Sequence, residues 1–414
     1  MPLPSRTSNR HRPGRRVTAL ALAAGLILGC SRDRPAVPEA AAVRDTAALR
    51  PLVDSLLPEL ARLASLPQRE PVRIARRSAA EVRQYVATRL AEEMPPAVIA
   101  ELQAVYSLLG LIPDSLDLSR LLLDLYTEQI VGYYDPHART LYVVDGVAPE
   151  SVAPVLAHEL VHALQDQYVD LDSLISRDRG NDVQTAAHAA VEGHATIVMF
   201  AYLAERAQGR RLDPVRLPNP AAELAAGLRT QNEQFPVFRT APPIIRETML
   251  FPYIGGADFV YRLWQAEPQE RPAPLGRWLP QSTEQVLHPD ERFLRQRDEP
   301  TALPPPAAPP GWRATGRSDQ LGELETAIFL AQHLGESARA LARGWDGDRY
   351  QLLADRNGHR ALIWSTVWDD TAAALRFEQA LRRIARSDHQ RGYRIEAHQE
   401  NGRHAVRVAI TPDS

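Results

Sequence analysis

A proline-rich stretch at 300–310, PTALPPPAAPP, divides this chain into two parts. Proline fixes φ and has no backbone N–H, so neither a helix interior nor a central strand continues through such a run. Segments rich in proline form stiff, extended spacers instead. We therefore expect a linker at 300–315 between a domain at 43–299 and a smaller module at 316–414.

The part before the linker has mainly the apolar spacing of helices. Apolar residues recur at that spacing from 43 to 130, where Ser78-Ala79-Ala80-Glu81 is a capping box that opens one helix. Residues 133–146 differ, because two β-prone stretches flank a turn that contains a proline, which predicts a hairpin. Further helices are expected at 151–168, 182–208, 220–232 and 243–266.

The part after the linker mixes both periodicities. Asn357-Gly358 and Asn401-Gly402 each stand between β-prone runs, and Asn-Gly is the strongest short hairpin signal. We expect strands at 349–355 and 361–368, two more strands around Asn401-Gly402, and helices at 321–341 and 371–386. The fold class is therefore α+β: a mainly helical domain with a small sheet or hairpin, and a small C-terminal α+β module with an antiparallel sheet.

Composition excludes several classes of protein. Apolar residues make up 44% and charged residues 24% of the chain, unlike a polytopic membrane protein or a disordered chain. All 48 basic residues are arginine, but 51 acidic residues leave a net charge of -3, so we expect no nucleic-acid partner. The single cysteine, Cys30, excludes an intramolecular disulfide and a cysteine-rich metal site.

Residues 1–29 predict a lipoprotein-type signal peptide. Arginines without any acid precede an apolar run at 17–28, which as a helix of about 18 Å is too short for a bilayer core of about 30 Å. Ile27-Leu28-Gly29-Cys30 resembles the lipobox of bacterial lipoproteins, in which the cysteine is acylated. We expect export, a tether at 30–42 and anchorage in the cell envelope through lipidated Cys30. Ser31 favours the outer membrane if the cell has two membranes.

The motif that carries chemistry is His158-Glu159-Leu160-Val161-His162, inside the predicted helix at 151–168. Imidazoles four residues apart lie on one helix face, where both can bind a single metal ion. Zn²⁺ lowers the pKa of a bound water to about 7. Glu159 is rotated by about 100° from His158, so it flanks the metal without binding it and can act as general base.

A zinc enzyme of this kind needs a third protein ligand and an open fourth position. Gln165 and Tyr168 stand where the elongated HExxH motif needs Gly and His, and the second Glu-x-x-His of a di-iron bundle is missing. The next helical segment supplies Glu192, the best-placed ligand, because an unpaired carboxylate in that apolar segment would be costly. His188, on the same face, is the competing ligand or a support for Glu192, whereas His194 lies about 200° away.

These motifs resemble the gluzincin branch of zinc metallopeptidases, and more closely a set of bacterial predicted lipoprotein peptidases. The resembling blocks cover about 130–350 and are EQIVGYYDPHARTLYVV, HELVHALQDQY, AAVEGHAT, FPYIGG, STEQVLHP and GWDGDRY. The resemblance implies a zincin-like fold for 43–299. It also implies that His158, His162 and Glu192 bind zinc and that Glu159 is the general base.

Three further expectations concern the surroundings of the metal. Many gluzincins have an Asp four residues after the ligand Glu that braces a histidine, but Thr196 stands there, which leaves Asp166 as a brace for His162. As in other zincins, the strand at Thr140–Asp145 would line the cleft and pair with extended substrate, unless it is an ordinary core strand. The developing oxyanion needs a donor, for which His288 and Tyr253 are the candidates, with a structural role as the alternative for each.

The sequence thus predicts an exported, lipid-anchored, zinc-dependent metallopeptidase of the cell envelope that hydrolyses protein or peptide substrates. One alternative is a non-catalytic zinc-binding envelope lipoprotein that acts as a scaffold or binding module. Another is a different metal hydrolase, because the ligand set identifies the metal site better than the substrate.

Overall fold

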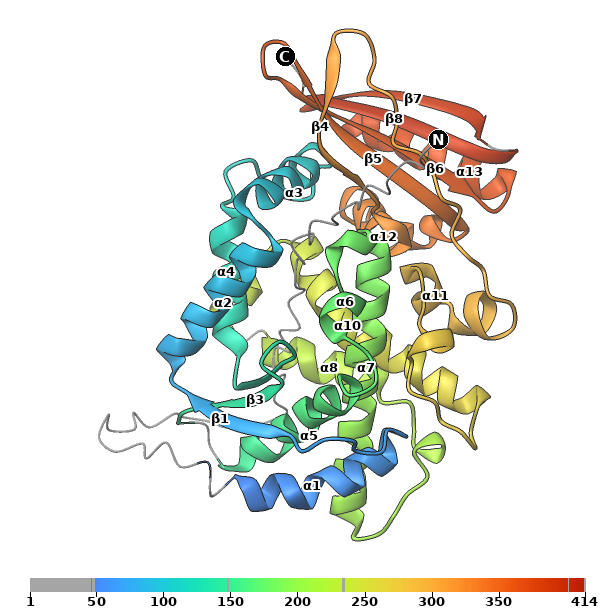
Figure 1. Cartoon of the computed structure of the whole chain (residues 1–414). Coiled ribbons are helices and arrows are strands. Elements are labelled where there is room, and N and C mark those ends of the chain that lie inside the picture. The colour runs from blue at the N-terminus through green and yellow to red at the C-terminus, as the bar shows by residue number, and fades with distance from the viewer. Residues whose placement is uncertain (1–45, 47–48, 147–148, 233–234, 401, 413–414) are drawn as a thin grey trace, which may run out of the picture.

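The computed structural model describes residues 46, 49–146, 149–232, 235–400 and 402–412. They form a mixed α+β structure in which a mainly helical part precedes a part built on one larger sheet (Figure 1), as predicted for the fold class. The predicted signal peptide, the tether and Cys30 lie outside the described residues. Within the described ranges, every helix is too short or too polar to cross a membrane.

Local sequence accounts for most helices of the first part. The capping box of α2 is formed: Glu81 N–H donates to the side chain of Ser78, and Ser78 N–H donates to the Glu81 carboxylate at 2.8 Å. The four helices expected between residues 151 and 266 are present as α5, α7, α8 and α10. The helices of this part are α1 (Arg50–Leu63), α2 (Ala79–Glu93), α3 (Pro96–Leu108), α4 (Leu118–Gln129), α5 (Pro149–Gln165), α6 (Leu171–Leu174), α7 (Asn181–Gln208), α8 (Ala221–Asn232), α9 (Pro236–Thr240), α10 (Pro243–Ala266) and α11 (Thr283–Leu287).

The first part also contains a small sheet of order β1-β3-β2. Strands β2 (Gly132–Asp135) and β3 (Thr140–Val144) form the predicted antiparallel hairpin. Strand β1 (Arg73–Arg77) was not predicted, because it lies in a stretch with helical spacing and is extended through parallel pairing with β3. Both edges of β3 are therefore occupied, so the expectation that Thr140–Asp145 pairs with substrate is wrong.

The second part is the expected antiparallel sheet, with strand order β4-β5-β6-β8-β7. The expected helix at 321–341 ends at Leu334, because Gly335 adopts φ 92, and a 3-10 helix at Glu336–Ala342 follows. Strand β4 was missed, since it begins within the stretch predicted as linker and pairs only at the sheet edge. The helices and strands of this second part are β4 (Trp312–Asp319), α12 (Gly322–Leu334), β5 (Trp345–Asp355), β6 (Arg360–Trp368), α13 (Thr371–Ser387), β7 (Arg391–Glu400) and β8 (Arg403–Pro412).

The two parts share one continuous apolar core. It extends from α1 through α5, α7 and α10 to the buried face of the C-terminal sheet, where α12 and α13 pack around Trp364. Residues 300–310 form neither helix nor strand, yet Thr301 is tied to β5, because its N–H donates to the Asp346 carbonyl at 2.6 Å. The boundaries of the predicted domains stay a prediction.

The helices that carry the candidate site meet at a close crossing. Helices α7 and α10 approach at Gly193 and Gly256, where a Cβ on Gly193 would lie 2.0 Å from the carbonyl carbon of Gly256. Helix α5 packs against α7 beside this crossing. The crossing therefore places α7 close against α10 on one side, while α5 packs against α7 nearby.

Candidate metal centre

Helix α5 presents both histidines of the motif on one face. Leu160 and Val161, which lie between them, are fully buried, so the helix is anchored in the core and the histidines face α7. The ring centroids of His158 and His162 are 4.8 Å apart. Both rings are buried, with 6% of His158 and 2% of His162 exposed.

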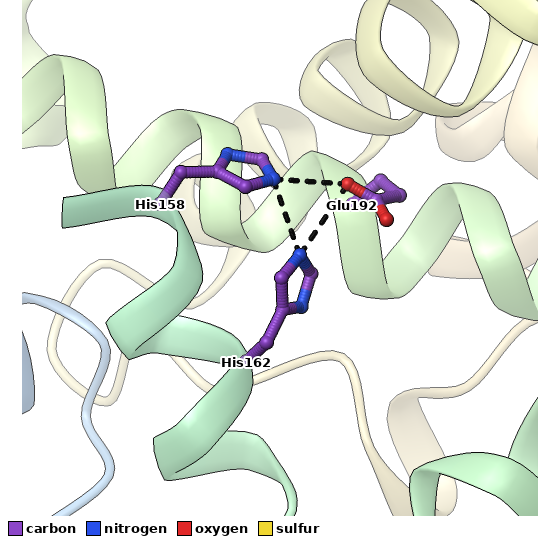
Figure 2. A group of neighbouring side chains, drawn as sticks. All are labelled: His158, His162 and Glu192. Carbon is purple, nitrogen blue, oxygen red and sulfur yellow. Dashed lines mark hydrogen bonds and ion pairs between the residues drawn. The ribbon is translucent and has the colours of Figure 1, made fainter. Parts of the chain in front are cut away.

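Helix α7 brings Glu192 to the two imidazoles (Figure 2). The Oε2 atom of Glu192 lies 3.0 Å from Nε2 of His158 and 3.4 Å from Nε2 of His162. The two Nε2 atoms are 3.1 Å apart. The structure therefore brings together all three residues that the sequence predicted as metal ligands.

The spacing of these three atoms suits a single ion. Tetrahedral ligands at about 2.0–2.1 Å from a zinc ion lie about 3.3–3.4 Å from one another. The observed separations of 3.0–3.4 Å are close to that value before any ion draws the ligands into place. Two imidazole nitrogens and one carboxylate oxygen are also a donor set typical of catalytic zinc.

The charges of these three side chains also favour a cation between them. Burial opposes ionisation of Glu192, but the positive charge of His162 and the hydrogen bonds from His158 and His162 outweigh it and hold the pKa of Glu192 well below its usual range. Burial lowers the pKa of His158. Burial also opposes a charge on His162, but the carboxylate of Glu192 outweighs it and raises the pKa of His162 to about 9. A buried carboxylate thus depends on a positive charge, which a metal ion between two neutral imidazoles can supply.

Glu159 stands beside this group without belonging to it. Its Oε2 atom accepts a hydrogen bond from the backbone N–H of Tyr134 in β2, at 2.8 Å. Its Oε1 atom is buried and has no hydrogen-bond partner among the described residues. Burial raises the pKa of Glu159 to about 8. One oxygen is therefore held by the sheet and the other has no partner, and a cation beside Glu159 would favour its ionised form, the form that accepts a proton.

The bracing of His162 differs from the expectation. Asp166 is bound elsewhere: its Oδ2 atom accepts from the Tyr134 hydroxyl at 2.9 Å, and its Oδ1 atom accepts from the Leu171 N–H at 3.4 Å. Gln165 braces His162 instead, with its Oε1 atom 2.8 Å from Nδ1 of His162. The sequence signal for this role is a polar residue three positions after His162 on a buried helix.

His188 lies beside Glu192 in this structure. Its Nε2 atom lies 3.3 Å from Oε1 of Glu192, the oxygen that does not face the histidine pair. The side chain of His188 is 28% exposed and is not part of the three-residue group. Of the two candidates for the third position, Glu192 is the one whose oxygen meets both imidazoles.

The two candidate oxyanion donors are in different places. The ring centroid of Tyr253, on α10, is 6.1 Å from that of His158. The Nε2 atom of His288 is 2.9 Å from Oε1 of Glu323. Glu323 interacts with Asp182 at the start of α7, about 15 Å along that helix from Glu192. The structure therefore brings Tyr253 to the histidine pair and His288 to another cluster.

A second group of acids, Glu284, Asp298 and Asp369, is close enough to hold an ion. Arg292 contacts all three carboxylates. Its guanidinium already lies among the three carboxylates, so this group is an ion-pair network that joins the 284–298 segment to the residue that follows β6.

Comparison with known proteins concerns the C-terminal sheet alone. Residues 312–413 match a family described as a domain of unknown function (DUF8575). The residues of the candidate metal centre lie outside that match. No curated protein matches the chain, and no solved structure matches it.

Proposed function

We propose that this protein is a zinc-dependent metallopeptidase with a zincin-like fold in its first part. The observation that carries the proposal is the convergence of His158, His162 and Glu192, whose donor atoms lie within 3.4 Å of one another. Glu159 adds a buried carboxylate with one unpartnered oxygen beside them. The resemblance of the surrounding motifs to gluzincins supports the same conclusion.

The proposed mechanism uses the residues of α5 and α7. His158, His162 and Glu192 would hold the zinc, which when bound would supply Lewis-acid activation of water and of the scissile carbonyl. Glu159 takes a proton from the attacking water as its oxygen bonds to the carbonyl carbon. As the C–N bond breaks, Glu159 gives this proton to the leaving amine. The Tyr134 N–H holds the other oxygen of Glu159 and so keeps the free oxygen in one direction.

We also propose that the protein is exported and anchored to the cell envelope through lipidated Cys30. The basic start, the short apolar run and the Ile27-Leu28-Gly29-Cys30 sequence support this proposal. The substrates would then be proteins or peptides that reach the envelope.

The test is Glu159→Gln in the mature chain, with zinc content and peptide hydrolysis measured on the same preparation. Gln retains the bond to Tyr134 N–H but cannot take up a proton, so hydrolysis should fall by about 10²–10⁴-fold. Zinc should stay near one ion per chain. Glu325→Gln is the matched control, because Glu325 is equally enclosed, with 4% exposed, but bonds to Tyr106 and Asn181 away from the metal group.

Other outcomes separate the alternatives. Full hydrolysis by Glu159→Gln would remove Glu159 from the mechanism. Glu192→Ala should lose zinc, and full retention would assign the third position to His188. Zinc binding by the unaltered chain without cleavage of any protein or peptide would favour the non-catalytic scaffold, and cleavage of another bond class would favour a different metal hydrolase.

A further inference from the structure

A buried polar chain leads away from His162 on the side opposite the metal position. Gln165 is fully buried, and its amide makes three contacts. Its Oε1 atom is 2.8 Å from Nδ1 of His162, and its Nε2 atom is 3.1 Å from the Val191 carbonyl and 3.0 Å from Nδ1 of His194. This chain connects a residue at the end of α5 with two residues of α7.

The partners of Gln165 determine which position of its amide group holds the oxygen and which holds the nitrogen. A backbone carbonyl only accepts hydrogen bonds, so the amide nitrogen must face Val191. The second hydrogen of that nitrogen then points to His194 and needs an acceptor there. The amide oxygen is left to face His162, and it can only accept, so Nδ1 of His162 must carry a hydrogen.

The same logic orders the protons of both rings. A ring that accepts a hydrogen bond at one nitrogen carries a hydrogen only on the other. Because Nδ1 of His194 accepts from Gln165, that hydrogen is on Nε2. In His162 the hydrogen on Nδ1 leaves Nε2 as the atom that faces His158 and Glu192.

The chain is held by packing as well as by hydrogen bonds. His194 is fully buried, and its ring meets that of Trp264 on α10 edge to face, with centroids 6.0 Å apart. A carboxylate at position 165 could accept from His162 but has no hydrogen for the Val191 carbonyl or for His194. An amide is therefore the side chain that satisfies one donor and two acceptors at this place.

We propose that Gln165 and His194 are positioning residues that hold His162 with Nδ1 protonated and Nε2 facing the metal. This inference rests on the zinc site of the proposed function. Partners of this kind fix the tautomer and orientation of metal-binding histidines, and their loss lowers metal affinity by about 10–100-fold.

The first experiment measures zinc affinity of the mature chain by competition with a chromophoric chelator. Gln165→Leu removes all three contacts and should weaken zinc binding by about 10–100-fold. Gln285→Leu is the matched control: Gln285 is also fully buried, accepts from Gln281 N–H at 2.7 Å and donates to the Asp298 carbonyl at 2.5 Å. It should lose stability but keep the native affinity. An equal loss of affinity in both variants, or none in Gln165→Leu, would overturn the proposal.

The second experiment observes the protons directly, by NMR of the zinc-loaded chain with ¹⁵N-labelled histidine. The expected result is hydrogen on Nδ1 of His162 and on Nε2 of His194. Gln165→Glu can still accept from His162, so it should bind zinc within a few-fold of native while His194 gains a hydrogen on Nδ1. A native His194 protonated on Nδ1, or a native His162 without that hydrogen, would overturn the proposal even if Gln165→Leu does not fold.

These measurements separate the inference from the proposed function. Zinc affinity and ring protonation do not depend on hydrolysis. A chain that binds zinc through an ordered His162 but cleaves nothing would refute the peptidase and leave the role of Gln165 intact. A chain that cleaves peptides and whose zinc affinity does not change when Gln165 is replaced would refute the role of Gln165 and leave the peptidase intact.

Discussion

Replacing Gly193 by alanine places a methyl group against the backbone of α10. The added Cβ would lie 2.0 Å from the carbonyl carbon of Gly256, 2.2 Å from its oxygen and 2.6 Å from the nitrogen of Ala257. All three atoms belong to the main chain, so no side-chain rotation relieves the contact. To reach an ordinary contact of 3.4 Å, the two helices must separate locally by about 1.4 Å.

Two opposing effects decide the size of the change. Alanine is favoured over glycine within a helix by about 0.8–1.0 kcal/mol. Overpacking of a well-packed core costs about 1–3 kcal/mol, and a contact between two backbones belongs at the upper end of that range. The net result is a loss of about 2 kcal/mol in the free energy of unfolding. Because Glu192 precedes Gly193 in α7, zinc affinity should fall as well.

The assay is equilibrium unfolding in urea, with zinc removed so that metal binding does not contribute to stability. Gly255→Ala on α10 is the control, since the atoms nearest to its added Cβ belong to the ring of Phe251, a side chain that can move. We expect a much smaller change there. A Gly193→Ala protein that is as stable as native, with unchanged zinc affinity, would show that the helices do not cross backbone to backbone at this point.

Two further predictions concern protons. Zinc must displace the proton of His162, whose pKa is raised to about 9, so binding at pH 7 should release at least one proton. Calorimetry in buffers of different ionisation enthalpy measures this release, and a binding enthalpy that does not depend on the buffer would contradict the charge assigned to His162. Burial raises the pKa of Glu325 from 4.5 to about 8, so its contribution to stability is complete below pH 4.5 and is lost as the pH rises to 8. The Glu325→Gln side chain cannot ionise. The free energy of unfolding of this variant, relative to that of the native protein, should therefore rise by up to about 1.4 kcal/mol per pH unit between pH 4.5 and 8, as measured by urea unfolding at several pH values. If the free energy of unfolding changed with pH in the same way in both proteins, Glu325 would not be the source of this pH dependence.

Features that depend on neighbouring residues in the chain could be predicted from the sequence. The capping box at Ser78, the β2–β3 hairpin and the strands that flank Asn357-Gly358 are encoded within a few residues, and all are present. Features that depend on distant pairing were missed. Strand β1 is extended because β3 lies beside it, and β4 is extended because β5 does.

The candidate site divides in the same way. The helical period alone places His158 and His162 on one face with Glu159 beside them, because 3.6 residues per turn is a local property of the backbone. The approach of Glu192, the hold of Tyr134 on Glu159 and the bracing of His162 by Gln165 rather than Asp166 were decided by the tertiary structure. The physical reason is that an interaction between two elements depends on where their backbones pass each other, which residues far apart in the chain decide, as Gly193 and Gly256 do where α7 crosses α10.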